Sequence, residues 1–211
     1  MSDRAAFDGS TSEIRYHLGI DYATADRPEG LVAVLVAVQQ SKPDPAKPPI
    51  QHVIVEDLVC LPGSATMSMF ATDILSMLGR AGLRWRDLAS VYGDNPVSSR
   101  FEFKSNLDLS KKLAHELRLP VTGLQPRILA AKEQTRSSGS RDAGCRYLYE
   151  LMASKRIIVR PRCQSLIEAI EQWDYTPMHR AKDRVDALRY SLKDYIFSSS
   201  NPHSGVRIRV G

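Results

Sequence analysis

Residues 14–22 read IRYHLGIDY, and this stretch decides the expected fold. Apolar and polar residues alternate along it, which is typical of a β-strand with one buried face. The segment GLVAVLVAVQ at residues 30–39 is short and rich in valine and leucine, as expected of a buried strand. Residues 51–61 contain three valines and precede a Pro-Gly pair, so they are a third strand. Three consecutive strands predict a meander.

The apolar period changes after the meander from two to 3.6 residues. Residues 67–78 carry their large apolar side chains at helical spacing, and residues 87–93, DLASVYG, follow as a fourth strand. A crossover helix lets this strand return parallel to the first. The remaining expected elements are a helix over 108–119, a strand over 127–131, and helices over 140–154, 164–173 and 183–196. The sequence thus predicts an α/β fold, with a central mixed sheet of about five strands flanked by helices.

Composition indicates one folded domain. The 211 residues are 43% apolar and 25% charged, which is ordinary for a globular protein. The domain is expected over residues 14–197, with a flexible N-terminal segment over 1–13 and a C-terminal tail over 198–211. No apolar run approaches the roughly 20 residues that cross a bilayer, and residues 1–12 are too polar for a signal peptide. No membrane partner is expected.

Net charge and cysteine content indicate the cellular compartment and the class of binding partner that we expect. Three widely spaced cysteines without a C-x-x-C pair fit neither a disulfide framework nor a zinc site, which indicates a reducing cytoplasm. The formal net charge of +5 and the pI near 9.2 favour polyanionic partners such as nucleic acid.

Two aspartates stand at the ends of expected parallel strands. Asp21 ends the first strand, and Asp94 follows the fourth. Neighbouring strands lie about 4.8 Å apart, so the two carboxylates can face each other. Because bare carboxylates at that range repel each other, a shared divalent cation is the natural way to neutralise them. A strand-end aspartate can also be only a turn-former.

The last expected helix adds two more acids. Asp183 and Asp186 are three residues apart in KDRVDALRYSL, so they share one helical face, and the apolar stripe of the helix can dock on the sheet. Four carboxylates then converge and can hold two hard divalent ions, Mg²⁺ or Mn²⁺. Two such ions activate a water and stabilise the leaving oxygen of a phosphodiester. The alternative is that Asp183 only caps its helix and Asp186 is a solvated surface residue.

Five segments resemble the nuclease domain of the large terminase subunit of tailed bacteriophages, a member of the RNase H-like superfamily. They cover most of the chain in order: LGIDYA at 18–23, VYGDNP at 91–96, AAKEQTRSSGSRDAGCRYL at 130–148, KRIIVRPRCQSLIEAIEQWDY at 155–175 and DRVDALRY at 183–190. The resemblance implies that Asp21, Asp94 and Asp186 are catalytic metal ligands. Asp183 occupies a position where the family often has another acid or a histidine, which implies a supporting ligand.

The same resemblance implies a biological role. The chain would be a two-metal endodeoxyribonuclease that cuts double-stranded concatemeric viral DNA during genome packaging, in the cytoplasm of the infected bacterial host. Its partners would be the terminase ATPase domain, the small terminase subunit and the portal. No G-x-x-x-x-G-K-[ST] motif occurs in these residues, so ATP-driven translocation is not expected in them. The chain is then either an excised nuclease domain or a free-standing relative.

Three basic residues are candidates for contacting the DNA backbone. Lys132, Arg136 and Arg141 flank a Ser-Ser-Gly-Ser loop after the fifth expected strand, where a flexible basic loop can hold phosphates without reading bases. A solvated loop of mixed charge is the alternative.

Three other functions remain open on the sequence. A RuvC-type Holliday-junction resolvase would prefer four-way junctions over linear duplex. A catalytically silent DNA-binding or docking module of the packaging motor would bind DNA without cutting it, since fold alone does not give chemistry. A transposase or integrase core would show strand transfer. His17 lies on the same face of the first strand as Asp21 and is interpreted as a packed or solvent-facing residue.

Overall fold

The computed structural model describes residues 13–22, 30–40, 51–93, 102–131, 139–173 and 182–196. The strands are β1 (Glu13–Tyr22), β2 (Leu31–Gln40), β3 (Gln51–Leu61), β4 (Leu88–Gly93), β5 (Ile128–Ala130) and β6 (Ile157–Val159). The α-helices are α1 (Met67–Arg80), α2 (Glu102–Glu116), α3 (Gly139–Ala153), α4 (Gln164–Gln172), α5 (Lys182–Ser191) and α6 (Lys193–Ile196), and three short 3₁₀ turns are η2 (Trp85–Asp87), η3 (Val121–Gly123) and η4 (Pro161–Cys163). None of the helices in these ranges is long and apolar enough to cross a membrane.

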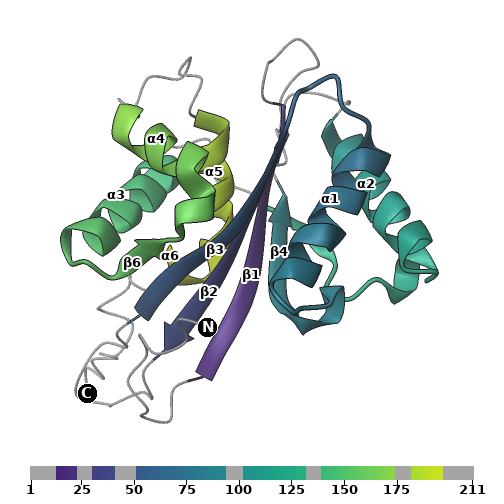
Figure 1. The fold of residues 1–211 in the computed structure, drawn as a ribbon, viewed down its shortest axis with the longest axis horizontal. Helices are drawn as coiled ribbons and strands as arrows, with labels where there is room; N and C mark the ends of the chain where they lie inside the picture. Colours follow the sequence, from purple (N-terminus) through teal and green to yellow (C-terminus); the bar gives the residue numbers. More distant parts are fainter. Residues whose placement is uncertain are drawn as a thin grey trace, which may run out of the picture.

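All six strands form one mixed sheet in the order β5-β4-β1-β2-β3-β6 (Figure 1). β1, β2 and β3 pair antiparallel as a meander, β4 returns parallel to β1, and β5 lies parallel to β4. The expected α/β architecture is therefore confirmed, including the parallel return of the fourth strand. The sheet has one strand more than expected, because Ile157–Val159 pairs with the outer side of β3. Three residues are too few for a strand period to be recognised in the sequence.

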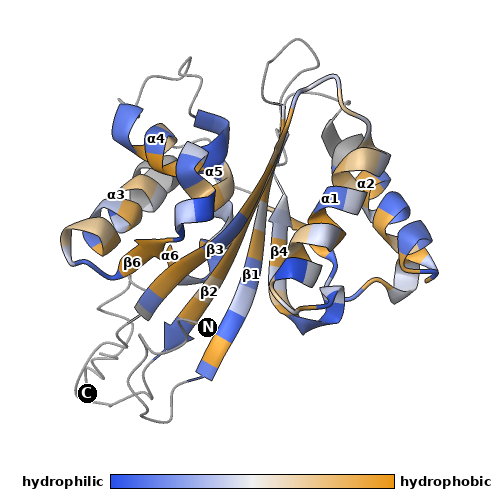
Figure 2. Cartoon of the chain, viewed as in Figure 1, coloured by the Kyte–Doolittle hydropathy of each residue, from blue (hydrophilic) through white to orange (hydrophobic). Residues whose placement is uncertain are grey.

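Helices cover both faces of the sheet. α1 and α2 lie on one face, and α3 to α6 lie on the other (Figure 1). The central strand β2 is buried on both sides: its even-numbered valines face α5, while Ala33 and Leu35 face α1. This double burial explains its continuous apolar sequence, which Figure 2 shows as an orange band through the middle of the molecule.

The C-terminal helix differs from the expected single helix over 183–196. It is divided into α5 and α6 at Leu192, whose amide donates to the carbonyl of Arg189, three residues back, at 3.2 Å. The hydroxyl of Ser191 donates to the carbonyl of Leu188 at 2.7 Å. A serine hydroxyl that takes a backbone acceptor competes with the helical ladder and can bend it, which accounts for the break that apolar spacing alone does not reveal.

Other boundaries shift by a few residues. β1 begins at Glu13, within the N-terminal segment expected to be flexible, and α2 runs over Glu102–Glu116 rather than 108–119. α2 ends before Arg118, whose positive φ of 55° stops a right-handed helix. The expected C-terminal tail at 198–211 lies outside the described residues.

A β-bulge in β3 supports the face that carries α1. Leu35 pairs with Asp57 and Val36 with Val55, so Glu56 is the extra residue. Asp57 is 5% exposed and accepts a hydrogen bond from Nε of Arg80, at the end of α1, at 2.9 Å. The bulge thus joins α1 to the sheet by a buried carboxylate.

Arg80→Ala is expected to lower the free energy of unfolding by about 1–3 kcal/mol, because it leaves the buried Asp57 carboxylate without its guanidinium partner. Urea unfolding measures the loss. The matched control is Arg84→Ala, which removes an exposed ion pair with Asp87 and should change stability far less than Arg80→Ala. Equal effects of the two substitutions would contradict the buried role of Asp57.

Candidate active site

Helix α5 lies directly on β1 at a glycine. A Cβ added to Gly19 would collide with the carbonyl oxygen of Ala187 and the amide nitrogen of Ser191. Only a residue without a side chain lets the helix backbone approach the strand this closely. This contact fixes which part of α5 lies over which part of β1.

The contact defines an antiparallel register between β1 and the α5–α6 segment. Nε2 of His17 lies 2.7 Å from the hydroxyl of Tyr195 in α6, whereas Gly19 meets the middle of α5. Two strand residues advance about 6.6 Å, which equals about four residues of a helix that rises 1.5 Å per residue. Asp21, two residues further along the same face, is therefore level with the N-terminal half of α5, which carries Asp183 in its first turn and Asp186 in its second.

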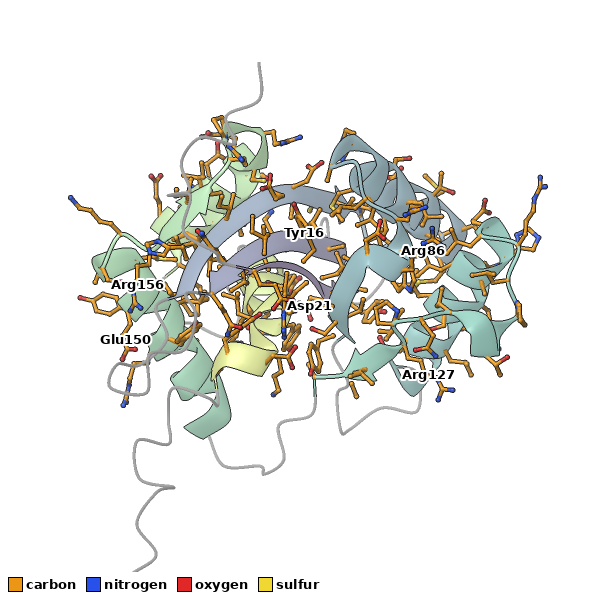
Figure 3. All side chains as sticks on the ribbon, turned by 90° about the horizontal axis from the view of Figure 1, so that it is seen from below. Tyr16, Asp21, Arg86, Arg127, Glu150 and Arg156 are labelled. Carbon is orange, nitrogen blue, oxygen red and sulfur yellow. The ribbon has the colours of Figure 1, made fainter. Side chains whose placement is uncertain are left out.

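All three of these acidic side chains are buried. Asp21 is 3% exposed, Asp183 4% and Asp186 3%. Figure 3 shows Asp21 in the middle of the molecule, beside the yellow C-terminal helices. Ionised carboxylates are rarely buried unless cations or hydrogen-bond donors compensate them. The interpretation of Asp186 as a solvated surface residue therefore does not fit its burial, whereas a capping role for Asp183 in the first turn of α5 stays open.

Two cations of the same helix compensate Asp186. Its Oδ1 accepts hydrogen bonds from Nε and Nη2 of Arg189 at 3.3 and 3.2 Å, and its Oδ2 lies 3.4 Å from Nζ of Lys182. The Arg189 side chain is itself only 5% exposed, whereas that of Lys182 is 27% exposed. The sequence analysis missed both residues, although their spacing of three and four from Asp186 is the signal that would have identified them.

The remaining candidate residues are not placed by the structure. Asp94, Lys132 and Arg136 lie outside the described residues, and so does the side chain of Arg141, at the beginning of α3. The strand that precedes Asp94 is described: Ser90 pairs with His17 and Tyr92 with Gly19, on the strand parallel to β1. The predicted roles of these four residues stay predictions.

The chemistry of the donors fits a hard divalent cation. Carboxylate oxygens are the ligands that Mg²⁺ and Mn²⁺ prefer, and β1 and α5 carry the three carboxylates of Asp21, Asp183 and Asp186. Among the residues that the structure describes, however, no three His, Cys, Asp or Glu side chains are grouped closely enough to hold one metal ion. A complete set of metal ligands therefore needs a further side chain, and the sequence predicts that this is Asp94.

A polar network lies beside this site, on the same face of the sheet. His17, Ser90 and Tyr195 are buried in it, whereas Tyr92 is partly buried and Asp194 is exposed. Nδ1 of His17 is 2.8 Å from Oγ of Ser90, which donates to Oδ2 of Asp194 at 2.7 Å. The hydroxyl of Tyr92 donates to Oδ1 of Asp194, and Tyr195 bonds His17 from the other side. We call these five residues the His17 network. Apart from His17, the sequence analysis singled out none of them.

The hydrogens of the network can be assigned. Since Ser90 gives its one hydrogen to Asp194, it accepts from Nδ1–H of His17, and Nε2 then accepts from the hydroxyl of Tyr195. Histidine is neutral in this arrangement, in agreement with burial, which lowers its pKa to about 4. The serine is not activated as a nucleophile, because its proton points to the carboxylate rather than to the imidazole.

Stability should fall in acid because of His17. Its pKa is lowered from 6.5 to about 4, chiefly by burial, with Asp194 opposing and Arg15 adding to the shift. The unfolded chain therefore binds the proton first, and the free energy of unfolding should drop by about 3 kcal/mol as the pH falls from 6.5 towards 4. Urea unfolding of the wild type and of His17→Gln across this range measures the difference. Parallel curves for the two proteins would contradict it.

A cavity of about 480 Å³ opens on the opposite face of the sheet. It is lined by Asn106, Leu107, Ser110, Val121, Thr122, Leu124, Arg127, Ile128 and Ala130. Asn106 accepts a hydrogen bond from the hydroxyl of Tyr22 at 2.8 Å, so its wall adjoins the end of β1. Among the described residues, no acidic or histidine side chain lines the cavity.

Comparisons with known proteins give limited information. No protein-family model matches the sequence, and the search of curated proteins finds no match. Among solved structures, the chain is similar to the crystal structure of the yeast mitochondrial Holliday junction resolvase Ydc2, with a TM-score of 0.41 and 12% sequence identity. The match covers 86% of this chain and 78% of the resolvase chain. A likeness at this TM-score decides nothing about function, and none of these comparisons supports the terminase resemblance specifically.

Proposed function

We propose that this chain is a divalent-metal-dependent endonuclease that hydrolyses DNA phosphodiester bonds. The observation that carries the proposal is the burial of Asp21 on β1 and of Asp183 and Asp186 on α5, the helix that docks on β1 at Gly19. Buried carboxylates are costly to maintain, and sites that maintain them are commonly functional. The positive net charge of the chain suits a polyanionic substrate.

The metal would be held by Asp94 together with carboxylates from the set Asp21, Asp183 and Asp186. When bound, it supplies an activated water and stabilises the charge on the leaving oxygen. The chain orients the ligands: β1 holds Asp21, and Arg189 fixes Asp186 from behind through a buried ion pair. Lys182, the first residue of α5, is partly exposed. Its ammonium group can therefore move away from Asp186 when a metal ion binds and can contact a substrate phosphate.

The finer role in DNA packaging rests on the sequence resemblance. On that resemblance, the chain cuts concatemeric DNA with two metal ions in the cytoplasm of an infected bacterium. Its partners are the terminase ATPase domain, the small terminase subunit and the portal. Lys132, Arg136 and Arg141 are proposed to contact the DNA backbone. A resolvase role on four-way junctions uses the same carboxylate chemistry, so the choice of substrate distinguishes the two.

The test is cleavage by the purified full chain at several Mg²⁺ and Mn²⁺ concentrations. Supercoiled plasmid, linear duplex and a four-way junction are offered in parallel. Nicking or linearisation of plasmid that requires the metal supports the endonuclease, and a marked preference for the junction would favour the resolvase. A folded protein that leaves all three substrates intact at every metal concentration would overturn the proposal.

A further inference from the structure

The His17 network connects the C-terminal helices to two strands at once. Tyr195 of α6 bonds His17 of β1, and Asp194 of α6 accepts from Ser90 and Tyr92 of β4. The ring of Tyr195 also meets the imidazole edge to face, with centroids 5.1 Å apart. The network therefore joins α6 to both β1 and β4 through side chains that all point to the same face.

These two strands are the ones that lead to the acidic positions. Asp21 lies four residues beyond His17 along β1, and Asp94 is two residues beyond Tyr92 along the chain. On the helical side, α6 follows α5 with only Leu192 between them. One set of hydrogen bonds thus connects every segment that carries a proposed metal ligand.

The contact at Gly19 gives the helical segment a second fixed point. The network holds its C-terminal end, the glycine meets its middle, and the acidic first turn lies at its N-terminal end. Two fixed points along a helix prevent it from sliding along the strand. One helical residue of sliding would move the acids by about 1.5 Å, which is enough to spoil metal coordination, since the ligand distances of metal sites hold to within about 0.2 Å.

We propose that the His17 network is a positioning device, which sets the register of α5–α6 on β1 and β4 and so holds Asp183 and Asp186 opposite Asp21. This inference rests on the proposed nuclease function for its purpose, but not for its geometry. The members of the network do not touch substrate or metal and act only through the helix. The burial of His17, Ser90 and Tyr195 suits the device, because a hydrogen-bonding group in a low-dielectric interior is costly to leave without its partner.

Two single substitutions remove a hydrogen bond of the network, and a third, conservative substitution keeps it. Ser90→Ala removes the hydroxyl between His17 and Asp194, and Tyr195→Phe removes the donor to Nε2 of His17. Ser90→Thr keeps a hydroxyl at the same position and is compatible with a strand, so it should rescue. Arg80→Ala is the matched control, because it destabilises the opposite face of the sheet without touching α5 or α6.

Two readouts are measured on the full chain. Amide hydrogen exchange at residues 186–188, which donate the first hydrogen bonds within α5, reports whether the turn from Asp183 to Asp186 is held, and Mn²⁺ titration reports the metal site. We expect Ser90→Ala and Tyr195→Phe to speed exchange in this turn and to weaken Mn²⁺ binding, each by about tenfold relative to Arg80→Ala compared at equal global stability. Ser90→Thr should return both readouts towards the wild type.

The two proposals fail separately. If exchange in the turn and Mn²⁺ affinity follow global stability alone, the network is merely structural and the positioning role is overturned. If the wild type binds no Mn²⁺ and cuts no DNA, the proposed function fails. The exchange measurement still decides in that case whether the network holds the turn.

Discussion

Asp21→Asn is expected to reduce metal-dependent DNA cleavage by about a thousandfold, which is the scale of losing one group that stabilises charge in a transition state. Asparagine keeps the size of the side chain and removes its charge, so the loss reports the carboxylate rather than packing. Asp21 is 3% exposed and lies on the face of β1 that carries α5, the helix of Asp183 and Asp186. Plasmid nicking in Mn²⁺ under single-turnover conditions measures the effect.

The matched control is Asp57→Asn. Asp57 is also a buried aspartate on a strand of the same sheet, but it pairs with Arg80 and belongs to the α1 side. Its substitution should lower stability and leave cleavage unchanged at temperatures where the protein stays folded. If Asp21→Asn cuts as fast as Asp57→Asn, Asp21 is not a metal ligand and the enzymatic assignment fails.

Gly19→Val is expected to destabilise the fold by about 3 kcal/mol, at the upper end of the usual cost of overpacking. Valine suits a strand by propensity, so the loss comes from collision with the backbone of Ala187 and Ser191. Backbone atoms cannot rotate away as a side chain does, and α5 must therefore lift from β1. Urea unfolding measures the cost, and tryptophan fluorescence confirms that the remaining fold is intact.

Gly79→Ala serves as the opposite control. A Cβ at Gly79, in the last turn of α1, meets no atom within 4 Å, so alanine should stabilise the helix by about 0.5–1 kcal/mol. A Gly19→Val protein as stable as the wild type would show that α5 does not dock on β1 as described. The register that brings Asp21 to the first turn of α5 would then be lost with it.

The order of elements could be predicted because the hydrophobic periodicity of each segment is a local property of the sequence. The sequences of β1, β2 and β3 show alternating or continuous apolar residues, and that of α1 shows apolar residues at helical spacing. β6 and the break at Leu192 could not be predicted. The strand is three residues long, and the break depends on which backbone acceptor a single serine hydroxyl takes.

The candidate acids can be recognised in the sequence for a similar reason. Asp21, Asp183 and Asp186 are visible as acids at a strand end and on one helical face, whereas their burial, which the structure shows, is not written in the sequence. Lys182 and Arg189 could have been found by their spacing from Asp186, but their pairing with a buried acid depends on which face of α5 meets the sheet.

The sequence by itself determined the α/β architecture, the meander and the residue types suited to a hard cation, because hydrophobic period and donor chemistry are local properties. Only the tertiary structure decided the register of α5 on β1 and the network that joins His17 to Asp194, 177 positions later in the chain. Those contacts depend on the close approach at Gly19 and on hydrogen bonds between segments far apart in sequence. Their free energy exists only when the whole sheet is assembled, so no local pattern encodes it.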